Sequence, residues 1–356
     1  MNYFNKENLY SSIGNKANLI DLEINEASSA TIMEYGGRLL GIFPQNTNYN
    51  LLWVNPSIID SIASESRVLG GERYWISPER EFFYKNPKTW EEWYCQKGLD
   101  PAKYEILDSD EKSCTLSTPI DIINNLTKER LLGEITRQLR VIKEPIQTGL
   151  KNFCGVEIID DCVIFKPNLK INGWSLSCVI SGGTKNPGTV LIPTKDEAKP
   201  LSYFRTIPED RVNVSYNHVS FKIDVDDIYK LAIRPEDLNF QIHAKIAHVI
   251  KIPDSKEFGI LIKLTNDVPN KQADCFDLSR DHPNSEIGVI QSYNSSSPSK
   301  PILNYGEIEI QLNKFKTIEN TSHGKALHLL CGYVGKKDEI LEIIEKYLAI
   351  NDPYLY

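Results

Sequence analysis

Short runs of alternating apolar and polar residues recur along most of this chain, and they constrain its fold more than any other feature. The runs are rich in Ile and Val and are separated by Pro, Gly, Asn or Asp clusters, the pattern of β-strands between turns. Successive strands without intervening helices form antiparallel sheets that stack or close on themselves. The sequence therefore predicts an all-β fold. The predicted strands cover 31–43, 155–165, 212–225, 239–252, 258–266, 287–294 and 305–312.

A helical period is rare in this sequence. Residues 338–349 form an amphipathic pattern with one apolar face, and Asp338 is placed to cap the start of the helix. A shorter helix is expected at 89–98, where Gly98 would end it. The C-terminal helix is expected to bury Ile340, Ile344 and Leu348 against a sheet and to leave Glu342 and Glu345 in water.

Composition and charge exclude several kinds of protein. The chain is 41% hydrophobic and 25% charged, as in folded soluble proteins, and no linker divides its 356 residues. We therefore predict one β domain over 1–356, with the helix 338–349 at its end. A net charge of −8 without a basic stripe argues against a nucleic-acid partner. The oligomeric state is left open.

The cysteines and the N-terminus bear on the compartment. No segment reads as a signal peptide or as a membrane span, so no membrane association is expected. Seven scattered cysteines without a CxxC pair favour reduced thiols in a cytoplasm, and they argue against a structural zinc site.

The stretch GGERYWISPEREFFYKNP, at 70–87, mixes many charges with many aromatic residues. If residues 73–81 run as a strand, side chains alternate between two faces, and Pro78 marks a strand end or a bend. Charged and polar groups together with one tryptophan then line one face, and the other face carries aromatic and aliphatic side chains. The first face would hold Arg73, Trp75, Ser77, Glu79 and Glu81, and the second Tyr74, Ile76 and Phe82.

Four segments together resemble the galactose-mutarotase-like superfamily. They are YGGRLLGIFPQNTNYNLLWVNP at 35–56, GGERYWISPEREFF at 70–83, WSLSCVISGGTKNPGTVLIPTK at 174–195 and YGEIEIQL at 305–312. The resemblance implies a large antiparallel β-supersandwich, a sugar site on the concave face of one sheet, and no metal or organic cofactor. It does not by itself imply mutarotation.

A sugar ligand would explain the mixed composition at 70–87. Sugars present apolar C–H faces and hydroxyl edges, so their sites combine aromatic rings with charged or amide groups. The alternative is a solvated ion pair beside a core tryptophan. Lys230, in a segment that resembles one with a recurrent lysine in the superfamily, is a further candidate, although a solvated turn lysine explains it equally well. The candidate ligand-binding residues are Arg73, Trp75, Glu79, Arg80 and Lys230.

The resemblance also implies a general base and a general acid. Aldose epimerases of the superfamily place a carboxylate in a late strand as Glu-x-Gln, which Glu309 and Gln311 match. Glu307 alternates onto the same face, where two acids can raise each other's pKa. A solvated sheet face gives the same alternation. The base is therefore assigned to Glu309, with Glu307 and Gln311 as ligand-binding neighbours.

Two histidines are candidates for the acid. YNHVSF resembles the superfamily's acid motif through His218, but Ser220 stands where a tyrosine is expected, and the segment lies downstream of the expected strand. His243 is preferred, because alternation places it on the polar side of 239–252. A structural or surface histidine is the alternative for each.

Three functions remain open from the sequence. The first is a sugar-binding protein without mutarotase activity, the second an aldose 1-epimerase or related isomerase, and the third a glycan hydrolase or lyase, which needs two opposed carboxylates. Because each lies on the polar side of its strand, we expect one shared concave pocket to bring together Arg73, Trp75, Glu79, His243 and Glu309. The alternative is that these residues lie on separate, solvated outer faces.

Overall fold

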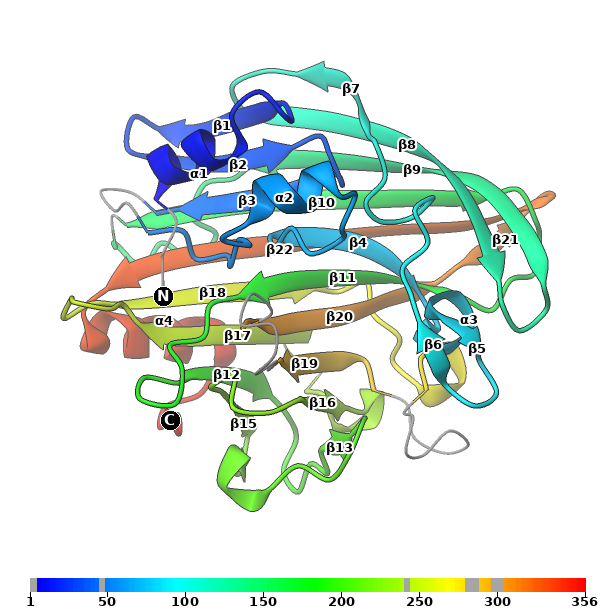
Figure 1. The fold of residues 1–356 in the computed structure, drawn as a ribbon. Helices are drawn as coiled ribbons and strands as arrows, with labels where there is room; N and C mark the ends of the chain where they lie inside the picture. The colour runs from blue at the N-terminus through cyan, green and yellow to red at the C-terminus, as the bar shows by residue number, and fades with distance from the viewer. Residues whose placement is uncertain (1–4, 45–48, 151, 240–243, 279–287, 296–303) are drawn as a thin grey trace.

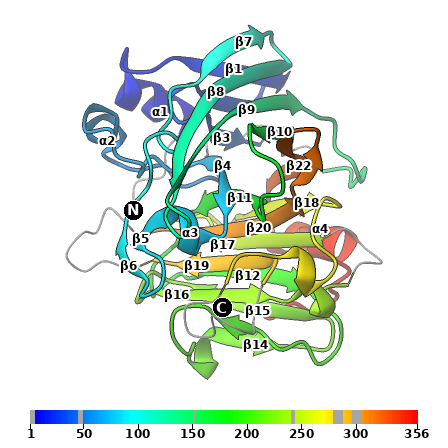
Figure 2. The same ribbon diagram turned by 90° about the vertical axis from the view of Figure 1, so that its right-hand side faces the viewer.

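The computed structural model describes residues 5–44, 49–150, 152–239, 244–278, 288–295 and 304–356. Within these ranges two large antiparallel sheets stack against each other (Figure 1 and Figure 2). Apolar side chains from the facing surfaces of both sheets form the main core. The predicted fold class, an antiparallel β-sandwich with a C-terminal helix, is confirmed.

The first sheet has nine strands in the described part of the chain, and it carries the candidate site. Its neighbouring strands are antiparallel throughout. In spatial order they are β1 (Leu19–Asn25), β2 (Ser28–Met33), β3 (Arg38–Phe43), β4 (Glu72–Ser77), β11 (Asn172–Val179), β20 (Gly306–Lys314), β19 (Ile290–Asn294), β16 (Tyr229–Ile233) and β13 (Leu201–Ser202).

The second sheet has eleven strands among the described residues, and a small hairpin of β5 (Tyr84–Asn86) and β6 (Glu91–Trp93) stands apart from both sheets. Ten strands of the second sheet form one row, and β21 (Lys316–Ile318) pairs with β22 beside it. The row is β14 (Val212–Val214), β15 (His218–Ile223), β12 (Gly188–Pro193), β17 (Ala244–Lys251), β18 (Phe258–Thr265), β22 (Thr321–Gly335), β10 (Phe153–Ile164), β9 (Glu129–Val141), β8 (Ser113–Asn124) and β7 (Glu105–Ser109).

Helices cover parts of both outer surfaces. The first two helices pack on the outer face of β2 and β3, and the last packs on the outer face of the eleven-stranded sheet. No helix among the described residues is long and apolar enough to cross a membrane. The helices are α1 (Lys6–Ile13), α2 (Ile58–Ala63), α3 (Glu79–Phe83) and α4 (Lys337–Leu348), with 3₁₀ turns η1 (Glu209–Arg211), η2 (Pro235–Asp237) and η3 (Gln272–Asp274).

Buried charges cross the space between the two sheets. The Arg137 guanidinium of β9 lies 2.7 Å from a Glu72 carboxylate oxygen on β4 and 2.6 Å from Asp160 on β10. It also donates to the carbonyl of Gly37 at 2.6 Å. Arg137, Glu72 and Asp160 are inaccessible to solvent, so the network joins the sheets where water cannot compete.

The C-terminal helix has the predicted orientation. Ile340, Ile344 and Leu348 are buried, and Glu342 and Glu345 are exposed. The start differs from the prediction, because the helix begins at Lys337 and Asp338 is not its cap. Instead, the backbone N–H of Lys336 donates to the Glu339 side chain at 2.6 Å.

The helix expected at 89–98 does not form, and that prediction is wrong. Residues 91–93 are the strand β6, which pairs with β5. Trp90 and Glu92 have φ of +57° and +55°, in the left-handed region that a helix excludes. Aromatic packing favours the hairpin: Trp90 meets Tyr84 edge-on at 5.2 Å, and Trp93 stacks on Phe83 at 6.0 Å between centroids.

The strand expected at 73–81 is also shorter than predicted. β4 ends at Ser77, and α3 starts two residues later. Pro78 has no N–H to continue the ladder. The next N–H, that of Glu79, donates to the Asp277 carboxylate at 2.8 Å instead of to a strand. The bend predicted at Pro78 is therefore present.

Other predicted strands exist with shifted bounds. Segment 31–43 contains the end of β2 and all of β3, and segment 212–225 contains β14 and β15. Segment 239–252 becomes β17 from Ala244 onward, and residues 240–243 lie outside the described part of the chain.

We predict that Ile344→Ala lowers the free energy of unfolding by about 2–5 kcal/mol, because it removes a fully buried side chain between α4 and the sheet. Glu345→Ala, one position along on the exposed side, should change it by less than about 0.5 kcal/mol. Urea unfolding measures both. Equal effects of the two substitutions would contradict the packing described for α4.

Candidate functional site

The candidate site lies on the outer face of the nine-stranded sheet, over its central strands. Gly70 and Gly71 lead into β4 with φ of +92° and +74°, and a Cβ at Gly70 would lie 2.3 Å from a backbone oxygen of Trp53. This turn sets the phase of β4, so that Glu72 faces the other sheet and Arg73 faces outward.

The register of the central strands places polar side chains from neighbouring strands side by side. Trp75 pairs across β11 with Trp174, which pairs with Gln311 on β20. Two residues before Gln311 on β20, and therefore on the same face, Glu309 pairs with Gln291 of β19. The next row joins three further residues of this face, Glu307, Tyr293 and Lys230.

Glu309 is bound on one side only. Its Oε2 lies 3.0 Å from the Lys230 ammonium and accepts from Trp174 Nε1 at 3.1 Å. Its Oε1 is buried and has no hydrogen-bond partner. The residue is 1% exposed, so one acceptor of the carboxylate is withdrawn from water without compensation.

Arg73 and Glu307 form a buried ion pair. Their side chains approach to 2.6 Å, and the guanidinium lies 4.2 Å from the centre of the Trp75 ring. Trp75 in turn donates from Nε1 to Asp100 at 2.9 Å. Arg73 and Trp75 are therefore engaged with other protein groups and are almost fully buried.

Glu79 connects the nine-stranded sheet to the β5–β6 hairpin and to the segment that contains Asp277. Its carboxylate accepts from Trp93 Nε1 at 2.9 Å and lies 3.9 Å from the Lys230 ammonium. Its backbone is held by Asp277, which also accepts from the Gln291 amide at 3.0 Å. We call the residues Arg73, Glu79, Lys230, Asp277, Glu307 and Glu309 the charge cluster.

The charge cluster contains more carboxylates than cations, and the pKa values reflect this. Burial, reinforced by Glu307 and Glu79, raises the pKa of Glu309 to about 7 despite the nearby Lys230. Burial and Asp277 also raise the pKa of Glu79. Burial opposes ionisation of Glu307 too, but Arg73 keeps its pKa below the usual value. The cluster can therefore hold or release a proton near neutral pH.

A cavity of about 460 Å³ opens beside the charge cluster. Glu79 lines it and is the residue that the cavity and the cluster share. Glu309 does not line it; its carboxylate lies 3.0 Å from the Lys230 ammonium, which lies 3.9 Å from Glu79. The other walls are largely aromatic, and they include Trp93, Phe204, Tyr293 and Tyr305, with Arg67 among them.

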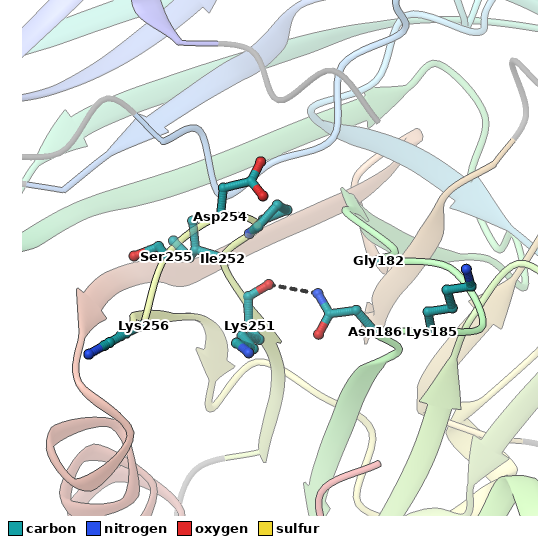
Figure 3. Close-up of a pocket in the computed structure, with 9 residues that line it drawn as sticks. Gly182, Lys185, Asn186, Lys251, Ile252, Asp254, Ser255 and Lys256 are labelled. Atoms are coloured by element: carbon teal, nitrogen blue, oxygen red, sulfur yellow. Dashed lines mark hydrogen bonds between the residues drawn. The ribbon is translucent and has the colours of Figure 1, made fainter.

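A larger hollow, of about 800 Å³, lies elsewhere, between the loops at 182–186 and 251–256. Lys185, Lys251 and Lys256 lie around it, but their side chains point in different directions (Figure 3). The side-chain amide of Asn186 donates to the Lys251 carbonyl at 3.0 Å. Convergent polar groups, which mark a ligand site, are not built there.

Most of the residues predicted for the site share one face. Glu79 reaches the same cluster from α3, whereas Arg80, also on α3, does not line the cavity. Glu81 leaves the group, because its carboxylate accepts from Asn124 of the other sheet at 2.6 Å. The predicted residues that do lie on the outer face of the nine-stranded sheet are Arg73, Trp75, Lys230, Glu307, Glu309 and Gln311. The role of these residues in ligand binding stays a prediction.

The two candidate histidines have different outcomes. His218 lies on β15 in register with Pro193, on the face that carries Leu191 and packs toward α4. Its Nδ1 contacts Asn217, and burial lowers its pKa. Two sheets separate this face from Glu309, so the structure does not bring His218 together with the predicted base. His243 lies outside the described residues and stays a prediction.

Several residues of the site were missed in the sequence. Trp93 sits in the segment predicted as a helix, and Arg67 lies in a loop with no pattern. Gln291 and Tyr293 fall on alternating positions of the predicted strand 287–294, so their shared face was readable. Trp174 lies in a segment that was quoted only for its resemblance to the superfamily. What was not readable is that their strands are neighbours.

One group among the described residues has the composition of a metal site. Ligand atoms of Glu72, Asp160 and His328 lie within 4.8 Å of one another, between the sheets. Arg137 already supplies a cation to both carboxylates at 2.6–2.7 Å. The arrangement fits an ion network better than a metal centre.

The fold and the cavity define a β-sandwich protein with a charged, aromatic-walled cavity on one sheet. The model of a family of unknown function (DUF6786) matches residues 5–351, so the chain belongs to that family. No curated protein matches the chain.

Solved structures of mutarotase-related proteins are similar to this chain at low identity. They are a GalM/aldose epimerase homologue from C. elegans (10% identity, 90% of this chain, 99% of that chain, TM-score 0.42) and two proteins from Lactobacillus acidophilus. These are a galactose mutarotase related enzyme (9%, 90%, 98%, 0.41) and a galactose 1-epimerase (9%, 90%, 98%, 0.43). Similarity at this level leaves the ligand and the chemistry open, and both are inferred below from the side chains of this chain.

The raised pKa of Glu309 predicts a pH dependence of stability. The folded protein binds a proton up to about pH 7, whereas an unfolded glutamate loses it near 4.5. The folded state therefore loses stability as pH rises from about 4.5 to 7, on the order of 3 kcal/mol for this group. Glu309→Gln should remove most of that loss in urea unfolding at pH 5 and pH 8.

Glu345→Gln serves as the control, since it also removes one carboxylate but from the exposed side of α4. An equal pH dependence in the wild type and Glu309→Gln would show that Glu309 has an ordinary pKa.

Proposed function

We propose that this protein binds a carbohydrate in the cavity beside the charge cluster. The observation that carries the proposal is the placement of Glu79, which both lines an aromatic-walled cavity of about 460 Å³ and belongs to the cluster. Ligand sites combine apolar walls with a few convergent polar groups, and cavities of this size take small molecules.

The aromatic walls provide apolar surface for sugar C–H groups. Tyr293 and Tyr305 meet edge-on at 6.4 Å, and Phe204 meets Tyr293 at 6.0 Å between centroids. Tyr305 is held from behind by stacking on Trp53 at 4.5 Å. Rings fixed in this way lose little conformational entropy when a ligand binds.

The polar groups of the cavity wall can form hydrogen bonds with the hydroxyl groups of a sugar. The Glu79 carboxylate is a hydrogen-bond acceptor at the cavity wall, and Lys230 stands behind it at 3.9 Å. Arg73 and Trp75, which the sequence assigned to direct ligand contact, are almost fully buried and bound to protein groups. We assign them the role of holding the cluster in place.

A related isomerase is the second candidate, and the unpaired Oε1 of Glu309 favours it. Because Glu309 does not line the cavity, its proton would pass through Lys230, which lies 3.0 Å from Glu309, and then through Glu79, which lies 3.9 Å from Lys230. A carboxyl group with a pKa of about 7 is suited to move a proton at neutral pH. Opening a sugar ring also needs a proton donor at the ring oxygen. Each histidine of the described residues lies on the eleven-stranded sheet, on β15, β17 or β22. Among the described groups Glu79 or Lys230 would have to serve, and His243 stays the alternative.

We predict that glucose or galactose binds saturably, and that Glu79→Gln at pH 8 weakens binding about tenfold, because a charge-assisted hydrogen bond contributes roughly 1.5–3 kcal/mol. Titration calorimetry measures the affinity. Glu91→Gln, an exposed carboxylate on the same hairpin as Trp93, should leave it unchanged. The same affinity for wild type and Glu79→Gln would remove Glu79 from the site.

Anomer exchange followed by NMR in these samples separates the two candidates. Exchange accelerated by the protein and lost in Glu309→Gln would establish the isomerase. Binding without acceleration is the result expected for a sugar-binding protein.

A further inference from the structure

Arg67 differs from the other arginines around the cavity. Arg73 binds Glu307, and Arg205 binds Asp227. Arg38, just behind them, binds Asp100 at 2.7 Å. The Arg67 side chain lines the cavity, yet among the described residues it has neither an ion pair nor a hydrogen bond. It is a cation with its donors free at the wall of a candidate ligand site.

The position of the Arg67 guanidinium is nevertheless fixed. Its central carbon lies 4.3 Å from the centre of the Trp93 ring and 5.9 Å from that of Trp75. Its backbone carbonyl accepts from Arg38 at 3.1 Å, which anchors the loop between α2 and β4. Stacking on a ring orients the flat group and leaves its edge N–H donors available.

The acids at the cavity wall do not neutralise Arg67. Asp227 is paired with Arg205. Glu79 is bound by Trp93 Nε1 and faces Lys230. Glu307 acts on Arg67 through its charge, but it forms its ion pair with Arg73. A neutral sugar would therefore leave the guanidinium without a direct carboxylate partner, whereas a carboxylate or phosphate matches its fork of donors.

We infer that the natural ligand is an acidic sugar, whose carboxylate or phosphate group binds Arg67. The inference rests on the proposed carbohydrate-binding function and adds the substrate class. Arg67 is then the residue that determines specificity, while Glu79 and the aromatic walls contact the rest of the sugar. Uronic acids and sugar phosphates carry the same chemistry, and separate arms of the test distinguish them.

The test compares each acidic sugar with its neutral parent by titration calorimetry on the full chain. The probes are galacturonate and galactose 6-phosphate against galactose, and glucuronate and glucose 6-phosphate against glucose. We expect at least one acidic sugar to bind the wild type tenfold or more tightly than its parent. Arg67→Gln should abolish that preference, so that the acidic sugar and its neutral parent bind with equal affinity.

Two further variants make the result specific. Arg67→Lys keeps the charge but not the fork, and should retain part of the preference. Arg130→Gln removes an exposed arginine that pairs with Asp121 on the other sheet, so it makes the same change in net charge and should retain all of it. Thermal unfolding without ligand identifies any variant that fails to fold, in which case Arg67→Lys decides.

The possible results distinguish a failure of the role assigned to Arg67 from a failure of the proposed carbohydrate binding. Equal affinity for acidic and neutral sugars, or a preference that survives in Arg67→Gln, overturns the role of Arg67 but leaves carbohydrate binding in place. Binding of neither class of sugar overturns both. A preference confined to uronic acids or to sugar phosphates identifies which anionic group Arg67 binds.

Discussion

The buried ion network around Arg137 is the interaction on which the rest of the structure depends. One guanidinium, inaccessible to solvent, bonds to Glu72 on the nine-stranded sheet and to Asp160 on the eleven-stranded sheet. Removing one partner of such a pair costs roughly 3–5 kcal/mol, because a charge is left uncompensated in a medium that solvates it poorly. Lys263 reaches the same place from β18 and donates to Ser175 at 2.7 Å. The two sheets are thus held in one relative position by bonds of defined geometry as well as by apolar packing.

The ion network around Arg137 also fixes the candidate site, because β4 carries one residue of each: Glu72 belongs to the network and Arg73 to the charge cluster. Glu72 points into the sandwich and Arg73, the next residue, points out of it, so holding the first orients the second. Arg73 then positions Glu307 through their ion pair. The pairing register of the strands from β11 to β16 places Glu309 and Lys230 next to them on the same face. A cavity on a sheet face held in this way needs little reorganisation to bind a ligand.

The architecture could be predicted well from the sequence and the site only in part, because sequence patterns report local structure and the site depends on contacts between distant segments. Alternation is a local property, so it gave the strands and the outward direction of Glu307, Glu309 and Gln311. It could not give strand order, which is why the meeting of Glu309 with Lys230, 79 positions apart (309 − 230), emerged only from the structure. Trp93 was misplaced because packing on Phe83 overrode a helix-like pattern.

The most direct test of the account is the location of a bound sugar. A crystal of the protein soaked with a monosaccharide that binds in solution should show the pyranose ring between Glu79 and the rings of Tyr293 and Tyr305, with an acidic substituent at Arg67. Density for the sugar in the hollow between 182–186 and 251–256, or on any other surface, with the aromatic cavity empty, would contradict the central claim.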